Sequence, residues 1–549
     1  MIKGLPSTMN DEWQLNLWKV IHYAAKVHSL TEVISYRTLQ GGQVHRLNYK
    51  LAYERVCAMA NALKSLGVKP GDRIAILGWN DHRYYESCFS ISGIGAVALH
   101  LNLRLHPSEL IHVLNHAGAR ALFVDDTLLT LAEELAKSHK FDFFVVMSDK
   151  SLAQISTSLS PLYGYEELIA QSPKTYDWEE IDEKSAALAC YTSGTTGMPK
   201  GVLYSHRALI LQCWTLSNVL KLDVSDVFLV IVPLFHVNAW ATPMAVTMVG
   251  AKLVLPGRYT PESLVEIMVR EGVTVTAGAP AILMPILEVL RRMEPKQKLN
   301  IRIMTAASEP SPALQKGLAE FGIKIIHAYG TTETHLLTAN LPKPEIKALP
   351  AEQQWEHARK QGIPVFGVEA KLIDLSTGEE VPWNGKSVGE LCVRGPWVIK
   401  EYYNDPRTRE AMTPDMYWRT GDVGCIDELG YFKIVDRAKD LIKSGGEWIS
   451  SIDMENYLMT HPYVLEAAVV GVPHRKWEER PLALVVLREE YRSKPLQEVE
   501  NELREHLSKR FARWQLPDKI LFVEEIPKTS VGKFNKRVIR ERYKNVYLD

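Results

Sequence analysis

One eleven-residue segment combines the residue types that hold a phosphate group. It runs from Tyr191 to Gly201 with the sequence YTSGTTGMPKG and follows the apolar run AALAC, which is typical of a strand. Glycines let several backbone N–H groups turn toward one anion, hydroxyls add donors, and Lys200 supplies a positive charge. The three glycines among eight residues cost about 1 kcal/mol each relative to alanine, which indicates a constraint. The segment therefore predicts a phosphate-binding loop.

The spacing of this loop differs from that of the common nucleotide-binding loop. Gly194 and Gly197 are three residues apart, and no Gly-Lys-Ser/Thr sequence follows them. This spacing disfavours an ordinary P-loop nucleotidase. A surface turn rich in glycine and threonine is the alternative interpretation, and so specific a string makes it the weaker one.

Two further segments carry side chains suited to a nucleotide and a metal ion. AYGTTETH, from Ala328 to His335, contains Glu333, and Mg²⁺ takes few protein carboxylates. RTGDVG contains Asp422, whose carboxylate can accept both hydroxyl protons of a ribose diol, and Arg437 follows about fifteen residues later. Taken alone, the first segment is more typical of a helix N-terminus, and the two charges of ordinary surface residues.

A basic segment near the C-terminus, PKTSVGKFNKR, places Lys533 in a glycine-containing loop. When a carboxylate oxygen approaches an anionic phosphate, two like charges oppose each other. A cation that bridges both groups lowers the barrier most where charge moves. A basic tail that binds nothing is the alternative interpretation.

An apolar segment is a candidate for binding a hydrophobic group. PLFHVNAW, from Pro233 to Trp240, follows the strand-like VFLVIV. Trp240 is of a type suited to gate a hydrophobic channel, and a core tryptophan is equally consistent with the pattern.

In this order, the segments resemble those of the adenylate-forming enzymes, a family that includes acyl-CoA synthetases, luciferases and the adenylation domains of peptide synthetases. The resemblance spans nearly the whole chain and is closest to bacterial medium- and long-chain fatty acyl-CoA synthetases. It implies that a fatty acid or related carboxylate is activated with ATP and Mg²⁺ as an acyl-adenylate and then transferred to coenzyme A. An aryl or short-chain acid, or a carrier protein or oxygen as acceptor, is the alternative within the family. A non-catalytic nucleotide- or lipid-binding protein is the alternative from another class.

The resemblance also implies roles for single residues. Tyr329 packs on adenine, Thr332 contacts the α-phosphate, and Glu333 and Thr192 hold Mg²⁺. Asp422 and Arg437 bind the ribose, and Lys533 joins Thr332 and Glu333 as a catalytic residue of the first half-reaction. His236 resembles the family's common histidine at the acyl pocket. The residues implied to bind ATP or coenzyme A are Thr192, Ser193, Gly194, Thr195, Thr196, Gly197, Lys200, Val237, Trp240, Ala307, His327, Ala328, Tyr329, Gly330, Thr332, Asp422, Arg437, Lys439, Lys443 and Trp448.

Departures from the family pattern fall in two segments. Ala307 stands where glycine is common, Glu309 where a small residue is usual, and His335 where serine or another small residue often lies. The first two lie in the segment from Ala306 to Pro310, which with Gly278 to Pro280 is expected to line the adenine and acyl pockets. The acyl chain length is therefore not predicted.

The resemblance further implies that one site serves two steps. After adenylation the C-terminal domain swings about Lys439, removes Lys533 and brings Gly445 to Trp448 to coenzyme A. A solvated helix face is the alternative for Lys439 and Lys443, which lie four residues apart.

Alternating patterns predict the elements that position these residues. A helix near Tyr53 to Leu66 precedes expected strands at 73–77, 97–101, 121–124 and 141–147, and the alternation returns with strands at 273–277, 301–306 and 324–328. We therefore expect an α/β fold with parallel sheets in an N-terminal domain (1–437), with a β-rich subdomain at about 368–435. A mobile α+β C-terminal domain (438–549) follows. Lys343 to Lys360 is a candidate linker or a solvated helix.

Composition limits the class of protein. The formal charge is −1, so no global field attracts nucleic acid, and six separate cysteines without a CxxC pair favour a reducing cytoplasm. No stretch reaches the roughly 18 apolar residues of a membrane span, so we expect no integral membrane segment, although peripheral membrane contact remains open. The resemblance makes a homodimer an expectation.

Overall fold

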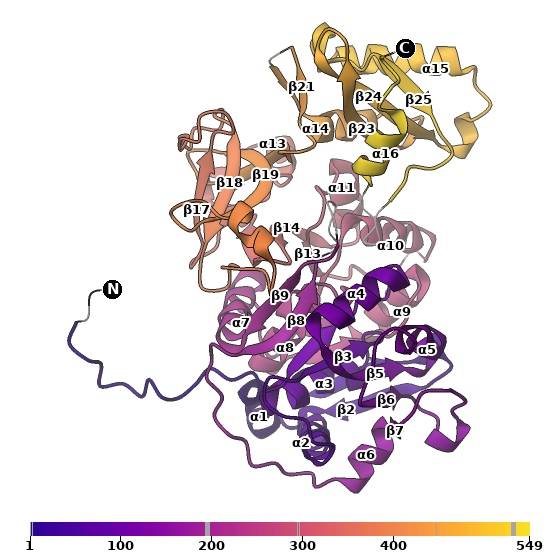
Figure 1. The fold of residues 1–549 in the computed structure, drawn as a ribbon. Coiled ribbons are helices and arrows are strands. Elements are labelled where there is room, and N and C mark those ends of the chain that lie inside the picture. The colour runs from indigo at the N-terminus through magenta and orange to yellow at the C-terminus, as the bar shows by residue number, and fades with distance from the viewer. Residues whose placement is uncertain are drawn as a thin grey trace. The chain divides into compact units, whose positions relative to one another are not determined.

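The chain divides into two units. Figure 1 shows the helices and strands that form them, labelled in chain order. The structure is a computed structural model that describes residues 2, 4–192, 198–293, 295, 297–445, 447–528 and 534–548. The described residues of the first unit fall within the ranges 2–192, 198–368 and 394–410. Those of the second unit fall within 369–393 and 411–548. The domain boundary predicted at residue 437 stays a prediction.

A mostly parallel sheet forms one layer of the first unit. Its neighbours pair in parallel except the last two, β8 and β9, which are antiparallel. Apolar side chains of the strands and of helices α4 and α5 form one buried core cluster. In sheet order the described strands are β7 (Leu162–Gly164), β6 (Phe143–Met147), β5 (Ala119–Asp125), β3 (Arg73–Leu77), β4 (Val97–His100), β8 (Ala186–Tyr191) and β9 (Gly201–Ser205).

A second large sheet belongs to the same unit. Its central strands are parallel, whereas β2 at one edge and β15 and β16 at the other are antiparallel. Helices α9, α10 and α11 pack on it through a second core cluster. In order the described strands are β16 (Ile363–Pro364), β15 (His335–Ala339), β14 (Lys324–Thr331), β13 (Arg302–Thr305), β12 (Val275–Ala277), β10 (Val227–Leu229), β11 (Lys252–Leu255), β1 (Glu32–Tyr36) and β2 (Val44–Asn48).

Local signals set the ends of the helices. Before α9, the Oγ1 of Thr260 accepts a hydrogen bond from the backbone of Ser263 (3.2 Å), Pro261 begins the helix, and Gly272 ends it with a φ of +66°. The described helices of this unit are α1 (Trp18–Val27), α2 (Tyr49–Ser65), α3 (His82–Gly93), α4 (Pro107–Ala117), α5 (Leu129–Ala136), α6 (Tyr165–Gln171), α7 (His206–Leu220), α8 (Thr242–Val249), α9 (Pro261–Glu271), α10 (Pro280–Met293), α11 (Pro312–Glu320), α12 (Pro344–Lys347) and α13 (Ala351–His357).

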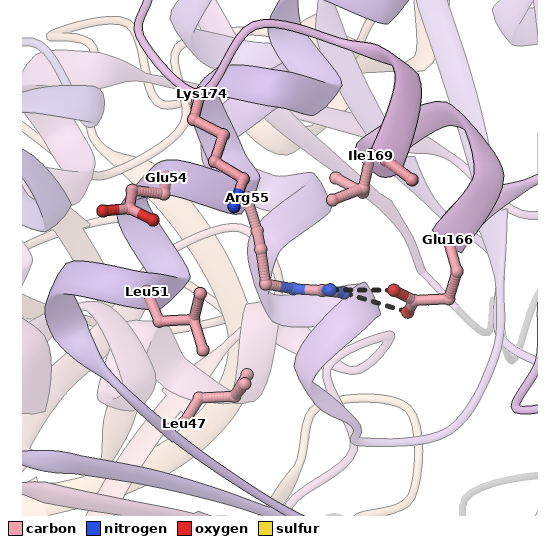
Figure 2. Close-up of a pocket in the computed structure, with 8 residues that line it drawn as sticks. Leu47, Leu51, Glu54, Arg55, Glu166, Ile169 and Lys174 are labelled. Carbon is pink, nitrogen blue, oxygen red and sulfur yellow. Dashed lines mark hydrogen bonds and ion pairs between the residues drawn. The ribbon is translucent and has the colours of Figure 1, made fainter.

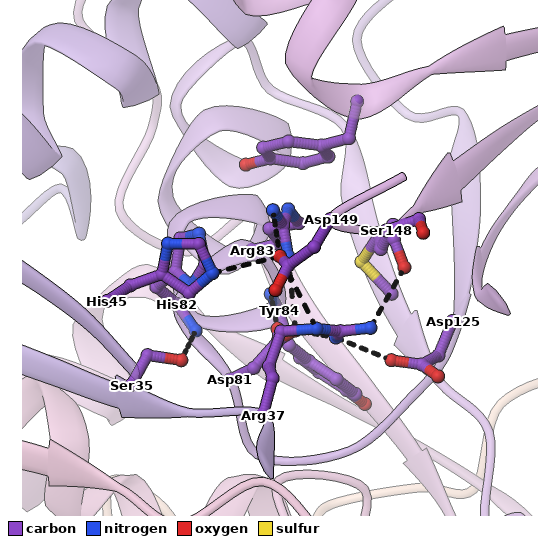
Figure 3. A network of polar contacts seen from close by, with 12 residues as sticks. Ser35, Arg37, His45, Asp81, His82, Arg83, Tyr84, Asp125, Ser148 and Asp149 are labelled. Carbon is purple, nitrogen blue, oxygen red and sulfur yellow. Dashed lines mark hydrogen bonds and ion pairs between the residues drawn. The ribbon is translucent and has the colours of Figure 1, made fainter. Parts of the chain in front are cut away.

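A buried ionic network joins β1, α3 and the first sheet (Figure 3). The guanidinium of Arg37, at the end of β1, contacts Asp81 and lies 2.7 Å from Asp125. Arg83 of α3 lies 2.8 Å from Asp149. Burial lowers the pKa of Arg37, but the carboxylates of Asp81 and Asp125 more than offset this and raise it above its usual range. All twelve residues of α3 are buried although many are polar. The Arg83 ion pair, and the hydrogen bonds that the Ser87 and Ser92 hydroxyls donate to carbonyls of the same helix, satisfy several of these groups.

The second unit holds two smaller sheets. An antiparallel one contains β17 (Glu369–Ile373), β18 (Gly389–Arg394), β19 (Trp418–Ile426) and β20 (Phe432–Arg437). The other contains β22 (Glu447–Ile449), β21 (Ile442–Ser444), β24 (Glu478–Leu487), β23 (Val464–His474) and β25 (Lys519–Phe522), which pairs in parallel with β24. The described helices here are α14 (Ser451–Leu458), α15 (Leu496–Ser508) and α16 (Lys536–Tyr543).

The predicted α/β fold class is confirmed, and two local expectations are wrong. The expected strand at 73–77 coincides with β3, and each of the other expected strands overlaps a strand of the two parallel sheets. Lys343 to Lys360 is not a linker: it forms α12 and α13, with His357 and Arg359 buried. Lys439 and Lys443 lie in a turn and on β21 rather than on a helix face, so the helix alternative is wrong. Among the helices within the described ranges, none has the length and apolarity that crossing a membrane requires.

Candidate nucleotide-binding site

The predicted phosphate loop connects the antiparallel strands β8 and β9. Tyr191 pairs with Gly201 in the register of these strands. Beyond this pair, the Thr192 N–H donates to the Lys200 carbonyl (2.9 Å), and the Lys200 N–H donates to the Thr192 Oγ1 (3.2 Å). Two predicted binding residues, Thr192 and Lys200, are thus held together at the base of the loop. Ser193, Gly194, Thr195, Thr196 and Gly197 lie outside the described residues.

Two histidines of α4 support this loop and were not predicted from the sequence. The Nδ1 of His116 lies 2.8 Å from the Tyr191 hydroxyl, and the Nε2 of His112 lies 3.3 Å from the Pro199 carbonyl. The two rings stack with centroids 5.5 Å apart. Their spacing of four residues on one helix was a signal for a shared face, but nothing in the sequence indicated that α4 lies beside the loop.

The predicted metal-binding segment forms the turn between β14 and β15, not the N-terminus of a helix. Thr332 and Glu333 lie in this turn, which Thr331 and His335 close as a strand pair. The Tyr204 hydroxyl of β9 donates to the Thr332 carbonyl (2.6 Å), so the turn is tied to the strand that follows the phosphate loop. An added Cβ on Gly330 would lie 1.7 Å from the His335 carbonyl oxygen, so this position requires glycine.

A connecting segment, residues 399–408, bridges the phosphate loop and this turn. The Ile399 N–H donates to the Glu333 carbonyl (2.8 Å), and the Tyr403 N–H donates to the Gly201 carbonyl (2.9 Å). Between them, the Tyr402 hydroxyl donates to the Glu333 Oε1 (2.8 Å), while the Lys200 ammonium lies 4.0 Å from the centre of the Tyr402 ring. The structure therefore brings Lys200 to the ring face and Glu333 to the hydroxyl of Tyr402, a residue that sequence reasoning missed.

The surroundings shift the electrostatics of this cluster. Burial lowers the pKa of Lys200, and the nearby Glu333 carboxylate partly offsets this effect. The turn also begins at a buried strand: His327, Ala328 and Tyr329 of β14 are all buried. The His327 Nδ1 lies 2.8 Å from the Arg359 carbonyl, and burial lowers the pKa of His327 to about 4, so this imidazole is neutral near pH 7.

The predicted acyl segment has an unusual backbone. Five consecutive residues, 237–241, have φ between +49° and +61° and none is glycine. A left-handed residue that carries a Cβ costs roughly 1–2 kcal/mol, so the surrounding structure must hold this turn in place. Val237 and Trp240 both lie in it and both are buried. The roles predicted for these two side chains stay predictions.

The three residues that depart from the family pattern each have a distinct structural feature: a left-handed backbone, an ion pair or a buried ring contact. Ala307 has a φ of +76°, a conformation that glycine adopts at less cost, which accounts for glycine being common there. Glu309 forms an ion pair with Arg359. His335 is buried with its ring against Tyr204, centroids 4.4 Å apart, and neither ring nitrogen has a hydrogen-bond partner among the described residues. Burial lowers the pKa of His335 to about 3.

The predicted ribose residues face each other in the second unit. Asp422 on β19 and Arg437 on β20 are direct partners in the strand register, and their side chains form an ion pair at 3.2 Å. The sequence spacing of these two residues thus reflects a hairpin that brings a carboxylate and a guanidinium together.

The predicted pivot and coenzyme A residues follow directly along the chain. Burial lowers the pKa of Lys439, and Arg437 adds to this effect. Lys443 and Trp448 are cross-strand partners in the hairpin of β21 and β22, and the Trp448 side chain is exposed. Lys533 lies outside the described residues.

A cavity elsewhere in the first unit contains none of the predicted residues. It has a volume of about 210 Å³ and lies between α2, α6 and the loop after it, where Arg55 and Glu166 pair at 2.8 Å (Figure 2). The candidate site is therefore the cluster of the phosphate loop, the β14–β15 turn and the connecting segment.

Comparison with known families decides how this cluster is interpreted. Residues 22–403 match the family described as AMP-binding enzyme, and residues 453–533 match the AMP-binding enzyme C-terminal domain. The chain belongs to the AMP-binding enzyme family. A long-chain-fatty-acid–CoA ligase from Thermus thermophilus is 45% identical over 100% of this chain and 98% of its own length. A medium-chain-fatty-acid–CoA ligase from Ectopseudomonas oleovorans is 38% identical over 97% of both chains.

Two further similar proteins are named for acids other than fatty acids. A 3-methylmercaptopropionyl-CoA ligase from Ruegeria lacuscaerulensis is 38% identical over 96% of this chain and 97% of its own. The crystal structure of the anthranilate CoA ligase AuaEII in complex with anthranoyl-AMP superposes with a TM-score of 0.84, at 25% identity, over 97% of this chain and 98% of that one.

Proposed function

We propose that the protein is an ATP-dependent acyl-CoA synthetase that acts on a fatty acid. A carboxylic acid and ATP give acyl-AMP and pyrophosphate, and acyl-AMP and coenzyme A then give acyl-CoA and AMP. The observation that carries the proposal is the arrangement of Lys200 at the ring face and Glu333 at the hydroxyl of Tyr402, beside a glycine-rich loop. A cation and a carboxylate beside such a loop are the groups needed to hold a metal-bound triphosphate.

In the first step the acid's carboxylate attacks the α-phosphorus in line and pyrophosphate leaves. Lys200 and the loop from Thr192 onward stabilise the charge on the departing group, Thr332 contacts the α-phosphate, and Lys533 neutralises the approach of two anions. Tyr329 packs on adenine, while Asp422 and Arg437 bind the ribose. No covalent bond between enzyme and substrate is required.

The residues of the β14–β15 turn fit a magnesium ion. Glu333 offers a single half-buried carboxylate, and a carboxylate oxygen that accepts one hydrogen bond from Tyr402 keeps a lone pair for a cation. One carboxylate with Thr192 suits Mg²⁺, which usually keeps several waters and phosphate oxygens as ligands. Bound there, Mg²⁺ would neutralise part of the phosphate charge.

In the second step the coenzyme A thiol attacks the adenylate carbonyl and AMP leaves. We assign this step to the C-terminal segment after the pivot Lys439, with Lys443 and the exposed Trp448 as the residues that meet coenzyme A. A cytoplasmic location and a homodimer are retained as part of the proposal. A shorter or aromatic acid is the second candidate substrate, because a 3-methylmercaptopropionyl-CoA ligase matches 96% of the chain and the superposed solved structure is an anthranilate CoA ligase.

The decisive experiment measures AMP release and acyl-CoA formation with purified protein. The panel contains saturated acids of increasing length, 3-methylmercaptopropionate and one aromatic acid, each with ATP, Mg²⁺ and coenzyme A. We expect AMP and acyl-CoA in equal amounts, with a maximum among the medium or long chains. AMP without acyl-CoA would point to another acceptor, and no AMP with any acid would refute the proposal.

A further inference from the structure

Lys200 and Glu333 carry opposite charges in half-buried surroundings, and yet they do not pair with each other. Both residues lie in the described part of the chain, and there no ion pair within 4.0 Å joins them: the Lys200 ammonium lies over the Tyr402 ring, and Glu333 accepts from the Tyr402 hydroxyl. Burial lowers the pKa of Lys200 and the Glu333 carboxylate partly offsets this, so the two charges are close enough to interact. The side chain that each of them contacts instead is Tyr402, through its ring face and its hydroxyl respectively.

The backbone of Tyr402 is held by its own segment. Its N–H donates to the Thr408 Oγ1 (2.9 Å), and the Thr408 hydroxyl donates to the Asp405 carbonyl (2.9 Å). Asp405 in turn pairs with Arg407. The side chain is 5% exposed. A buried ring on a backbone held in this way offers its face to the ammonium and its hydroxyl to the carboxylate.

We propose that Tyr402 is a positioning residue that keeps the Lys200 ammonium and the Glu333 carboxylate apart and directs one to phosphate and the other to the metal. An aromatic face attracts an ammonium without neutralising it, and a phenol orients a carboxylate without removing its charge. With a small apolar side chain at 402, the two charges would pair directly, and each would be lost to its ligand. The inference rests on the proposed function, because it names ATP and Mg²⁺ as those ligands.

Two substitutions separate the two contacts of Tyr402. Tyr402→Phe keeps the ring under Lys200 and removes the hydroxyl, whereas Tyr402→Leu removes both contacts. Tyr417→Phe is the matched control, because Lys371 lies 4.4 Å from the Tyr417 ring centre and the Tyr417 hydroxyl donates to Glu369 at 3.0 Å, in a sheet of the second unit. Tyr417 thus has the same two kinds of contact as Tyr402, and Tyr417→Phe removes the hydroxyl contact at a position outside the candidate site.

Equilibrium binding of ATP to the full-length variants is measured by calorimetry, once with EDTA and once with Mg²⁺. Tyr402→Phe should bind metal-free ATP like wild type. The factor by which Mg²⁺ increases ATP affinity should be about tenfold smaller in this variant, which is the effect of one hydrogen bond to a charged group. Tyr402→Leu should also weaken metal-free binding, by about fivefold. Tyr417→Phe should match wild type in both conditions.

A second substitution tests the separation of charges directly. In Tyr402→Leu, the further change Glu333→Gln removes the carboxylate that captures Lys200, so metal-free ATP binding should return toward the wild-type value. Failure of this rescue, or Tyr402→Phe binding like Tyr417→Phe with and without Mg²⁺, would overturn the inference. Should Tyr402→Leu not fold, the comparison of the two phenylalanine variants still decides it. An absence of AMP formation by wild type would sink the proposed function and leave the ATP-binding comparison intact.

Discussion

At the scale of single residues, Gly330 shows how one backbone contact shapes the candidate site. A Cβ at this position would lie 1.7 Å from the His335 carbonyl oxygen, which is backbone and cannot rotate away. We expect Gly330→Ala to open the β14–β15 turn, to lower the free energy of unfolding by more than about 2 kcal/mol, and to abolish ATP binding. Urea unfolding and calorimetry measure the two effects.

The control for this prediction is another glycine with a different constraint. Gly272 has a φ of +66° and open space around an added Cβ. Gly272→Ala should therefore cost only about 1–2 kcal/mol, the cost of a left-handed residue with a Cβ, and leave ATP binding unchanged. Equal losses of stability in the two variants would show that the close approach to His335 is not what sets the effect.

The residues of the site divide by whether their role depends on local sequence. Glycines, hydroxyls and Lys200 fall within one short segment, and their chemistry could be predicted from it. Tyr402 could not, because its importance arises from two contacts with residues about 200 and 70 positions away. An aromatic residue in a polar segment has no property, in the sequence alone, that separates it from a core residue.

At the scale of elements, the buried network at Arg37 fastens β1 to α3 and to the first sheet (Figure 3). Arg37→Met would leave the buried carboxylates of Asp81 and Asp125 without their main partner. We expect this variant to lose about 3–5 kcal/mol of unfolding free energy, since breaking a buried pair leaves an uncompensated charge. Arg292→Met is the matched control, because Arg292 pairs with Glu262 at 2.7 Å on the surface, where a pair contributes about 0–1 kcal/mol.

The same elements show what the pattern of the chain could and could not predict. Alternating helices and short β-branched runs predicted the parallel strands from β3 to β6, because a crossover of that length joins neighbouring parallel strands. The antiparallel hairpin that holds the phosphate loop was not predicted, and neither was the position of α4 beside it. The hairpin joins strands that are close in sequence, but the apolar run before the loop predicted only the first of them. The position of α4 depends on which strands become neighbours in the sheet, and such long-range pairing leaves no local signal. Strand ends were predicted less well than strand positions, as β5 extends from Ala119 to Asp125 rather than over 121–124.

At the scale of the whole molecule, the proposal requires that the two half-reactions depend on different residues of the C-terminal segment. Lys533 lies just before α16, whose Lys536 pairs with Glu455 of α14 at 2.8 Å and donates to the Ser451 hydroxyl at 2.6 Å. Lys536 is thus a fixed structural residue three positions after Lys533, so the two lysines are expected to behave differently.

Lys533→Ala should lower ATP–pyrophosphate exchange by on the order of 10² or more, judged from the loss of single electrostatic donors in other enzymes. Conversion of supplied acyl-adenylate to acyl-CoA should survive, because that step has no second anion for Lys533 to neutralise. Lys536→Met should instead lower thermal stability, since it leaves Glu455 buried without its cation. Rapid-quench measurement of both half-reactions for the two variants makes the comparison. If Lys533→Ala slowed the two half-reactions equally, Lys533 would act in both of them. That result would contradict a swing about Lys439 that removes Lys533 from the site before the second half-reaction.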